Sequence, residues 1–198
     1  MSNLNLSQKL QFSQIGQDVI IWEKAKIVNS EVISIGDSVI IDDFVFLMGG
    51  SKTEIGSFVH IASFTSISGG GEFIMEDFSG LSGGVRIYTG NEDYNGGCLT
   101  NPTVPYPYRN VIRSFVHIKK HAIIGANSVI LPGVTIGEGV AVGANSLITK
   151  DCEPWKVYFG NPAKPIKNRP KEKILELECQ LKVETYDLQG IYIPKSQR

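Results

Sequence analysis

The stretch IKKHAIIGANSVILPGVTIGEGVAVGANSLITKDCE, residues 118–153, decides the fold of this chain. It divides into six consecutive hexads, and each hexad begins with Ile or Val. A period of six fits neither the alternation of a single β-strand nor the 3.6-residue repeat of an α-helix. It predicts short strands separated by corners, three of which complete a triangular coil. The fifth position of each hexad carries a small side chain that can turn inward near a corner: Ala122, Ser128, Val134, Val140, Ser146 and Cys152.

The N-terminal half carries the same period with interruptions. Aliphatic residues return every six positions over residues 15–27, 35–47 and 55–67, with a two-residue slip between successive runs. Slips of this size are expected from small insertions at coil corners. We therefore predict an all-β fold in which residues ~13–87 and ~112–153 form one parallel β-helix, with coils about 4.8 Å apart.

Corner residues and the chain ends complete the predicted architecture. Gly at the second hexad position and Asn at the fourth, as in Asn127 and Asn145, suit permissive or left-handed backbone. Pro170 marks a helix start, with apolar residues at 174, 177 and 181. We expect a β-helix unit over residues 1–169 and a C-terminal helix and tail over 170–198.

Bulk properties exclude several classes of function. The net charge of −1 provides no basic surface for nucleic acid or an anionic membrane. No apolar run is long enough to cross a membrane, and the N-terminal MSNLNLSQKLQFSQ has no signal-peptide core. Three widely spaced cysteines fit a reducing compartment better than a disulfide framework. We expect a cytoplasmic protein without membrane insertion.

Two motifs connect this pattern to known enzymes. The block IGANSVILPGVTIGEGVAVGANSLITKD at 124–151 and the sequence GNPAK at 160–164 resemble the left-handed β-helix, hexapeptide-repeat acyltransferases. Within them the chain is similar to the galactoside and maltose O-acetyltransferases, the antibiotic acetyltransferases and the enzymes that acetylate bacterial surface-polysaccharide sugars. The resemblance covers about residues 15–170. It implies a left-handed coil, a homotrimer with active sites between subunits, and acetyl-CoA as co-substrate without a metal.

The resemblance also indicates where acetyl-CoA binds, along the C-terminal coils. Corner backbone groups suit the pantetheine amides, cations suit the phosphates, and the proline of GNPAK stands where the family packs the adenine. Each of these residues has an alternative reading as a corner residue or as solvated surface charge. The expected donor residues are Gly125, Ala126, Gly143, Ala144, Lys150, Pro162 and Lys164, with Lys167 and Arg169 as further cations.

The hexad pattern stops at YTGNEDYNGGCLTNPTVPYPYR, residues 88–109, and resumes only after about residue 114. Long aperiodic loops are usually functional or disordered, and the prolines around Tyr106 and Tyr108 favour order. The resemblance implies an acceptor loop that leans over a neighbouring subunit. The alternative is a loop that only buttresses the trimer.

The entrance of this loop departs from the family pattern. In the similar sugar O-acetyltransferases a His follows a Thr-Gly pair, whereas here Asn91 follows Thr89 and Gly90, and the loop contains no His. Asn91 cannot act as a base, but its amide can orient the acceptor or the thioester carbonyl. Asp93 is the candidate base within the loop. Acceptor contacts are expected from Glu92, Tyr94, Tyr108 and Arg109.

Three histidines remain as candidates outside the loop. His60 and His117 occupy sixth hexad positions, which face outward from a wall of the prism. We predict that His60 is a base or an acceptor contact and that His117 contacts the acceptor, with a satisfied interface residue as the alternative for each. His121 occupies a corner and is expected to be a structural surface residue.

The missing loop histidine bears on the chemistry. A sugar hydroxyl needs a well-matched base, whereas an amine is nucleophilic once it has lost one proton. We therefore favour N-acetylation of a nucleotide-linked amino sugar for bacterial surface-polysaccharide synthesis. O-acetylation of a galactoside, a polysaccharide unit or an antibiotic is the main alternative. A zinc hydratase that uses the three histidines, and a scaffold without catalysis, are the alternatives of other classes.

Overall fold

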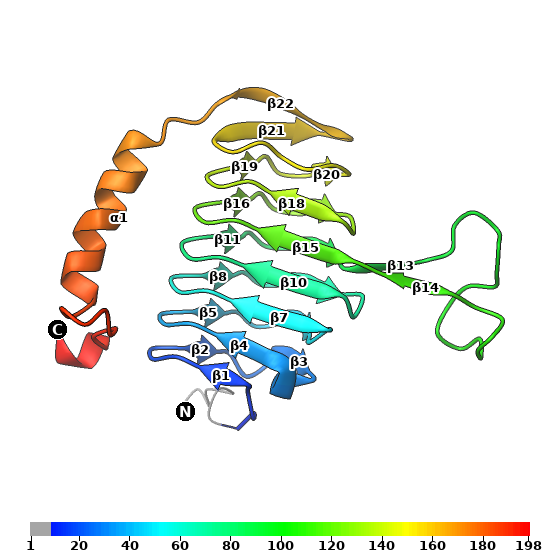
Figure 1. The fold of residues 1–198 in the computed structure, drawn as a ribbon, viewed down its shortest axis with the longest axis horizontal. Helices are drawn as coiled ribbons and strands as arrows, with labels where there is room; N and C mark the ends of the chain where they lie inside the picture. Colours follow the sequence, from blue (N-terminus) through cyan, green and yellow to red (C-terminus); the bar gives the residue numbers. More distant parts are fainter. Residues whose placement is uncertain (1–8) are drawn as a thin grey trace.

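The computed structural model describes residues 9–198 and shows a triangular prism built from three parallel sheets (Figure 1). The first eight residues, which the predicted β-helix unit includes, lie outside the described part. Sheet A forms one wall of the prism and contains β1 (Gln14–Ile15), β4 (Ile33–Ile35), β7 (Lys52–Ile55), β10 (Glu72–Met75), β15 (Phe115–Ile118) and β18 (Val134–Ile136).

The other two walls follow the same stacking. Sheet B contains β2 (Ile20–Ile21), β5 (Ile40–Ile41), β8 (His60–Ile61), β11 (Gly80–Leu81), β16 (Ile123–Ile124), β19 (Ala141–Val142), β21 (Lys156–Gly160) and β22 (Ala163–Asn168). Sheet C contains β3 (Lys26–Val28), β6 (Phe46–Met48), β9 (Ser66–Ser68), β12 (Arg86–Tyr88), β17 (Val129–Ile130) and β20 (Leu147–Ile148). The predicted all-β parallel β-helix is confirmed.

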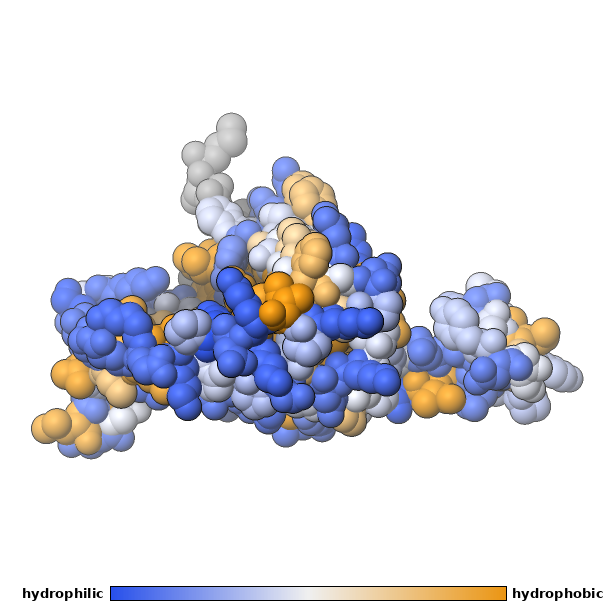
Figure 2. Space-filling model, turned by 90° about the horizontal axis from the view of Figure 1, so that it is seen from above, coloured by the Kyte–Doolittle hydropathy of each residue, from blue (hydrophilic) through white to orange (hydrophobic). Residues whose placement is uncertain are grey.

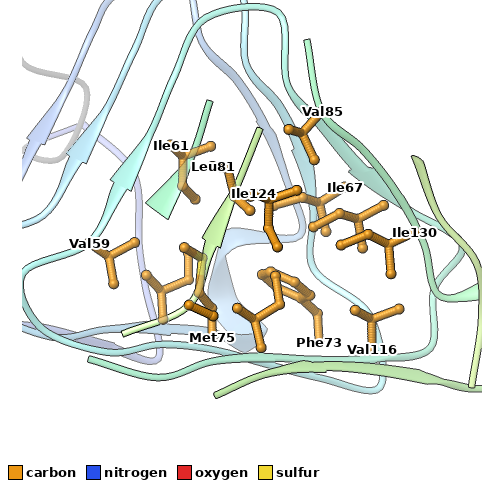
Figure 3. Close-up of a cluster of buried hydrophobic side chains, with 14 of the residues drawn as sticks. Val59, Ile61, Ile67, Phe73, Met75, Leu81, Val85, Val116, Ile124 and Ile130 are labelled. Carbon is orange, nitrogen blue, oxygen red and sulfur yellow. The ribbon is translucent and has the colours of Figure 1, made fainter. Parts of the chain in front are cut away.

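The interior is filled by the aliphatic positions that the hexad pattern predicted. Every first-position residue from Ile118 to Ile148 is at most 4% exposed. Figure 3 shows side chains of all three sheets meeting inside the prism, including Phe73 and Met75. Ile15 is an exception, 38% exposed, because β1 is the edge strand of sheet A.

The register of the sheets explains the slips in the sequence pattern. In the C-terminal coils Ile118 pairs with Ile136, three hexads later, whereas in the N-terminal coils Ile35 pairs with Ile55. The two additional residues lie where sheet C turns into sheet A. The long loop leaves between β12 and β15, at this same corner. It is therefore a much larger insertion at a corner that already tolerates small ones.

Three corners run the length of the prism. The helix corner joins sheets A and B at residues 16–19, 36–39, 56–59, 76–79, 119–122 and 137–140. The open corner joins sheets B and C at residues 22–25, 42–45, 62–65, 82–85, 125–128 and 143–146. The loop corner joins sheets C and A at residues 29–32, 49–51, 69–71, 88–114 and 131–133.

Left-handed backbone recurs at the fourth hexad position of the helix and open corners. Asn127 and Asn145 both have φ of 58°, as predicted. Phenylalanine takes the same conformation at four places, although it costs an L side chain about 1–2 kcal/mol. The four residues are Phe44, Phe58, Phe64 and Phe78, with φ of 64°, 57°, 65° and 57°.

Glycine at the second hexad position has a different reason from the one predicted. Gly125 does not have positive φ, but a Cβ there would lie 2.5 Å from the backbone N of Ala144 in the next coil. No real Cβ approaches backbone so closely, so the stacking of coils requires glycine. The close approach, rather than a left-handed turn, explains this position.

The C-terminal region extends further along the prism than predicted. The coils continue past residue 153, because β21 pairs in parallel with β19 and β22 then folds back antiparallel on β21. Helix α1 (Glu172–Thr185) runs down the outside of the helix corner (Figure 1). The tail, which contains a short 3-10 turn at Lys195–Gln197, returns to the first coil, where Tyr192 donates its hydroxyl to Asp18 at 2.9 Å. A second 3-10 turn, Ser30–Val32, lies at the loop corner.

Candidate active site

The excursion loop is an antiparallel ribbon that projects from the loop corner (Figure 1). Its two strands are β13 (Gly90–Glu92) and β14 (Val111–Arg113), and residues 93–110 form the far end. Asn91 is exposed in the middle of β13. Asp93 closes the next turn, since its Oδ1 accepts the N–H of Asn95 and its Oδ2 accepts the N–H of Gly97, each at 2.7 Å.

These bonds set the charge of Asp93. The backbone N–H of Asn95 has the largest effect in lowering the pKa of the Asp93 carboxyl, and the Cys98 thiol and the Gly97 N–H add to it. The carboxylate is therefore ionised at neutral pH. A lowered pKa makes it a weaker proton acceptor than a group tuned to neutral pH. It remains an effective hydrogen-bond acceptor for an ammonium or amine.

A second pair of predicted acceptor residues meets at the base of the ribbon's end. Arg109 Nη1 lies 3.5 Å from Glu92 Oε1, and the guanidinium stacks 4.9 Å from the centre of the Tyr106 ring. Glu92 Oε2 and Arg109 Nε are buried and have no hydrogen-bond partner within the described residues. Glu92 and Tyr94 also line a cavity of about 410 Å³ with residues 100–102.

Tyr108 and Tyr94, the two tyrosines expected to contact the acceptor, are not part of the Glu92–Arg109 pair. Tyr108 is 64% exposed and Tyr94 is 85% exposed at the surface of the loop.

The two outward-facing histidines lie on different walls. His60 is on β8 of sheet B, with Nε2 3.0 Å from Asp42 Oδ2. His117 is on β15 of sheet A, just beyond the base of the loop, and its Nε2 hydrogen-bonds Glu72. The loop leaves the corner between sheets C and A, so sheet B is the wall opposite to it. Within one protomer His60 does not meet the loop acids.

His121 is not the surface residue that the sequence predicted. It occupies a corner with φ of 60°, but it is only 6% exposed because α1 covers it. Its Nε2 lies 2.7 Å from Glu178 Oε2, and its ring stacks on Phe78. Within residues 9–198 no three His, Cys, Asp or Glu side chains converge as a metal site requires.

The predicted donor residues fall into two groups. Lys150, Pro162 and Lys164 line one cavity of about 210 Å³ beneath the turn between β21 and β22. This cavity places two cations beside an apolar ring, although the three residues are separated in the sequence. Its other walls come from residues 148–152, Tyr158 and Ala163.

The second donor group lies at the open corner. Gly125 and Ala126 stand one coil below Gly143 and Ala144, and the N–H of Asn145 donates to the Ala126 carbonyl at 2.8 Å. Coil stacking therefore uses part of the backbone that was expected to face pantetheine. The Phe159 ring lies against Gly143, where a Cβ would approach it to 2.5 Å.

Arg169 is not available as a phosphate ligand. Its Nη1 donates to the carbonyls of His121 at 2.9 Å and Gly139 at 3.0 Å, and burial lowers the pKa of its guanidinium. It ties the chain after β22 to the helix corner. Lys167, on β22, is exposed.

Sequence reasoning missed the aromatic corner residues. Phe58 and Phe78 stack with ring centroids 4.8 Å apart at the helix corner, and Phe44 and Phe64 stack 5.1 Å apart at the open corner. The signal was present, because phenylalanine recurs at the fourth position of four hexads in the N-terminal half. Glycine or asparagine is the usual choice for that backbone.

Comparison with known proteins agrees with this architecture. The bacterial transferase hexapeptide (six repeats) family model matches residues 115–150. The dTDP-4-amino-4,6-dideoxy-D-glucose acyltransferase of Escherichia coli is 43% identical over 176 residues, which cover 88% of this chain and 91% of that protein. The chain belongs to the hexapeptide-repeat acyltransferases. The predicted resemblance and the predicted enzyme class are confirmed.

Solved structures of the family extend the comparison. AntD, an N-acyltransferase from Bacillus cereus in complex with dTDP and 3-hydroxybutyryl-CoA, has a TM-score of 0.84 and 45% identity, covering 90% of this chain and 94% of that one. A variant of AntD in complex with dTDP-4-amino-4,6-dideoxyglucose and coenzyme A has a TM-score of 0.84 and 44% identity, with the same coverage. No helix within residues 9–198 of this acyltransferase is long and apolar enough to cross a membrane.

Proposed function

We propose that this hexapeptide-repeat acyltransferase transfers an acyl group from a CoA thioester to the amino group of a dTDP-linked amino dideoxy sugar. The observation that carries the proposal is the similarity to the E. coli acyltransferase over 88% of the chain. The AntD complexes support the same pair of substrates, because they hold dTDP or a dTDP-amino sugar together with coenzyme A or an acyl derivative. A loop with Asn91, Glu92 and Asp93 but without histidine fits an amine acceptor.

The reaction needs little acid–base chemistry from the protein. The free amine attacks the thioester carbonyl carbon, a C–N bond forms, and the C–S bond breaks. The amine loses one proton to become an amide, and the departing thiolate takes up one proton to become the CoA thiol. The amino sugar must also lose a proton from its ammonium form before the attack, and water or a carboxylate can accept it.

Asp93 is the residue that we assign to this amine. Its carboxylate is ionised at neutral pH, so it attracts the ammonium form and then accepts a hydrogen bond from the attacking amine. Asn91, on the neighbouring strand β13, is placed to orient the acceptor or the thioester carbonyl. Glu92 and Arg109 retain unpaired buried atoms that can contact sugar hydroxyls or phosphate.

A homotrimer with active sites between subunits completes the proposal. His60 lies on the wall opposite the loop corner, so only the loop of a second copy can bring Glu92 and Asp93 to it. We assign acetyl as the transferred group, a cytoplasmic location, where CoA thioesters and nucleotide sugars are made, and a role in bacterial surface-polysaccharide synthesis.

The test follows release of free CoA thiol with a panel of acceptors. We expect release from acetyl-CoA with dTDP-4-amino-4,6-dideoxyglucose and none with maltose or a galactoside. Asp93→Asn should lower kcat/KM by about 10–100-fold, because it removes a hydrogen bond between a charged carboxylate and the amine. Release with a hydroxyl sugar alone, abolished by His60→Ala, would instead identify an O-acetyltransferase.

Asp187→Asn is the matched control for the Asp93 variant. Asp187 also accepts two backbone N–H groups, from Gln189 at 2.9 Å and Ile191 at 2.8 Å, but it lies in the C-terminal tail. This control should leave kcat/KM unchanged. An equal loss in both variants would show that turn formation, rather than contact with the amine, explains the effect.

A further inference from the structure

The open corner carries a pair of aromatic rings that the protomer leaves uncovered. The rings of Phe44 and Phe64 are stacked, with centroids 5.1 Å apart and planes inclined by 6°. Phe44 is 50% exposed and Phe64 is 60% exposed. In the view along the prism, hydrophobic residues gather at the apex that points away from both α1 and the loop (Figure 2).

Stability of the protomer does not explain this pair. Both residues have the left-handed backbone that is unfavourable for a bulky side chain, with φ of 64° and 65°. At the helix corner the equivalent rings of Phe58 and Phe78 contact Tyr186, Tyr192 and His121 in compensation. Strained residues that lack such packing are concentrated at ligand sites.

The stack ends where a further planar group can be added. The same corner position in the next coil is Gly84, with φ of 76°, so that coil adds no ring to the column above Phe64. The Asn127 amide reaches over Gly84 from the coil beyond, as its Oδ1 would lie 2.2 Å from a Cβ there. The exposed Phe64 ring is thus followed along the corner by an exposed planar amide.

Charges of both signs surround the rings. The Lys24 ammonium lies 5.3 Å from the centre of the Phe44 ring, and Arg86 Nη1 donates to the carbonyl of Gly84 at 3.0 Å and to that of Phe64. Of the acids here, Asp42 pairs with His60, and Asp43 accepts the N–H of Lys24 at 2.8 Å. Lys24 and Arg86 thus provide one cation at each end of the phenylalanine stack.

A cavity beside the rings supplies hydrogen-bonding groups. It has a volume of about 330 Å³ and is lined by Trp22, Asp42, Asp43 and Ser63. The edge of thymine or uracil presents an N–H donor between two carbonyl acceptors. Carboxylate oxygens can accept from this N–H, and the Ser63 hydroxyl can donate to a carbonyl.

We propose that Phe44 and Phe64 form the stacking platform for the pyrimidine base of the nucleotide-linked acceptor, an inference that rests on the proposed function. Gly125, in the expected pantetheine group, lies two coils above Phe64 on the same corner, roughly 10 Å away at the usual strand spacing. A sugar and a diphosphate span a distance of this order. The open corner would then hold the acceptor below the donor.

A nucleotide explains these features better than a second copy of the chain. A ring from a neighbouring subunit could also cover Phe64, but it would bring no negative charge to Arg86. The diphosphate of a nucleotide does so, and every base has a face that stacks on an aromatic ring.

The experiment measures dTDP binding to the full-length protein by calorimetry for Phe64→Gly. Glycine already occupies the same position of the next coil at Gly84, so the fold tolerates it. We expect the affinity for dTDP to fall about 10-fold or more, while the affinities for inorganic pyrophosphate and for CoA stay unchanged. Phe64→Tyr, which keeps a ring, should retain the wild-type affinity.

Four other results would overturn the inference. An unchanged dTDP affinity in Phe64→Gly would show that no base stacks there. Dissociation of the oligomer in sedimentation, together with loss of dTDP binding, would show that a second copy covers the rings. If the wild type acylates the dTDP-amino sugar while Phe64→Gly keeps its KM, only this inference fails. A wild type that neither binds dTDP nor releases CoA would overturn the proposed function as well.

Discussion

The helix corner and the open corner contain the same local structure with opposite surroundings. Each carries two phenylalanines in left-handed backbone on consecutive coils, with nearly parallel rings about 5 Å apart. At the helix corner α1 and the tail contact the rings, whereas at the open corner Phe44 and Phe64 are 50% and 60% exposed. The covered pair stabilises the fold, and the uncovered pair is available to a ligand.

The covering segment is held by charge as well as by apolar contact. Glu178 is 8% exposed and receives hydrogen bonds from Lys120, Lys182 and His121. Burial by itself raises the pKa of Glu178, but these three partners outweigh it and bring the pKa to about 2. The contact joins α1 to the coil that follows the excursion loop.

The largest expected effect comes from removing this carboxylate. Glu178→Ala leaves three cationic or polar partners without their acceptor, so we expect a loss of about 3 kcal/mol in the free energy of unfolding. Chemical denaturation measures it. Glu176→Ala, which removes an exposed acid of the same helix paired with Lys173, should change stability by less than about 0.5 kcal/mol. Equal effects would show that the buried cluster contributes nothing particular.

Acid should weaken the helix corner through the same group. The folded pKa of Glu178, about 2, lies below its ordinary 4.5, so its stabilisation is complete above about pH 4.5 and is lost as the pH falls toward 2. We expect the unfolding temperature of the wild type to fall in this window more steeply than that of Glu178→Gln. Parallel curves for the two proteins would contradict the assignment.

Glycine substitutions compare the two corners directly. Phe78→Gly removes a ring that contacts Phe58 and His121, and the loss of packing minus the relief of strain predicts a destabilisation of about 2 kcal/mol. Phe64→Gly loses one exposed stacking contact, with Phe44, and gains a similar relief of backbone strain. Its stability should therefore stay within about 1 kcal/mol of the wild type. Equal destabilisation in thermal unfolding would remove the distinction between the corners.

The smallest expected effect concerns the cation at the open corner. Lys24→Met keeps the apolar stem but removes the ammonium above Phe44, and exposed cation–π contacts contribute about 0.5 kcal/mol. We expect this small loss of stability and an unchanged dTDP affinity, because Lys24 lies on Phe44, on the side of the stack away from Gly125. A clear fall in dTDP affinity would place the diphosphate beside Lys24 and contradict the proposed direction of the nucleotide.

Sequence reasoning succeeded where a residue's role depends on its neighbours along the chain. The hexads predicted the prism, its inward columns and the left-handed Asn127, because each coil repeats one short pattern. The motif GNPAK lies at a cavity lined by Pro162, and the break at 88–114 corresponds to the projecting ribbon. The roles of the loop residues in catalysis remain predictions.

Sequence reasoning did not predict the positions where two segments far apart in the chain meet. His121 read as a surface corner, and only the return of α1 along the prism buried it against Glu178, 57 residues later. The sequence suggested that Arg169 is a phosphate ligand, but its guanidinium donates hydrogen bonds to carbonyls of the helix corner. A six-residue period determines which side chains enter a coil. Long-range packing decides which corner the C-terminal segment covers, and this makes the Phe58–Phe78 pair half-buried while the Phe44–Phe64 pair stays exposed.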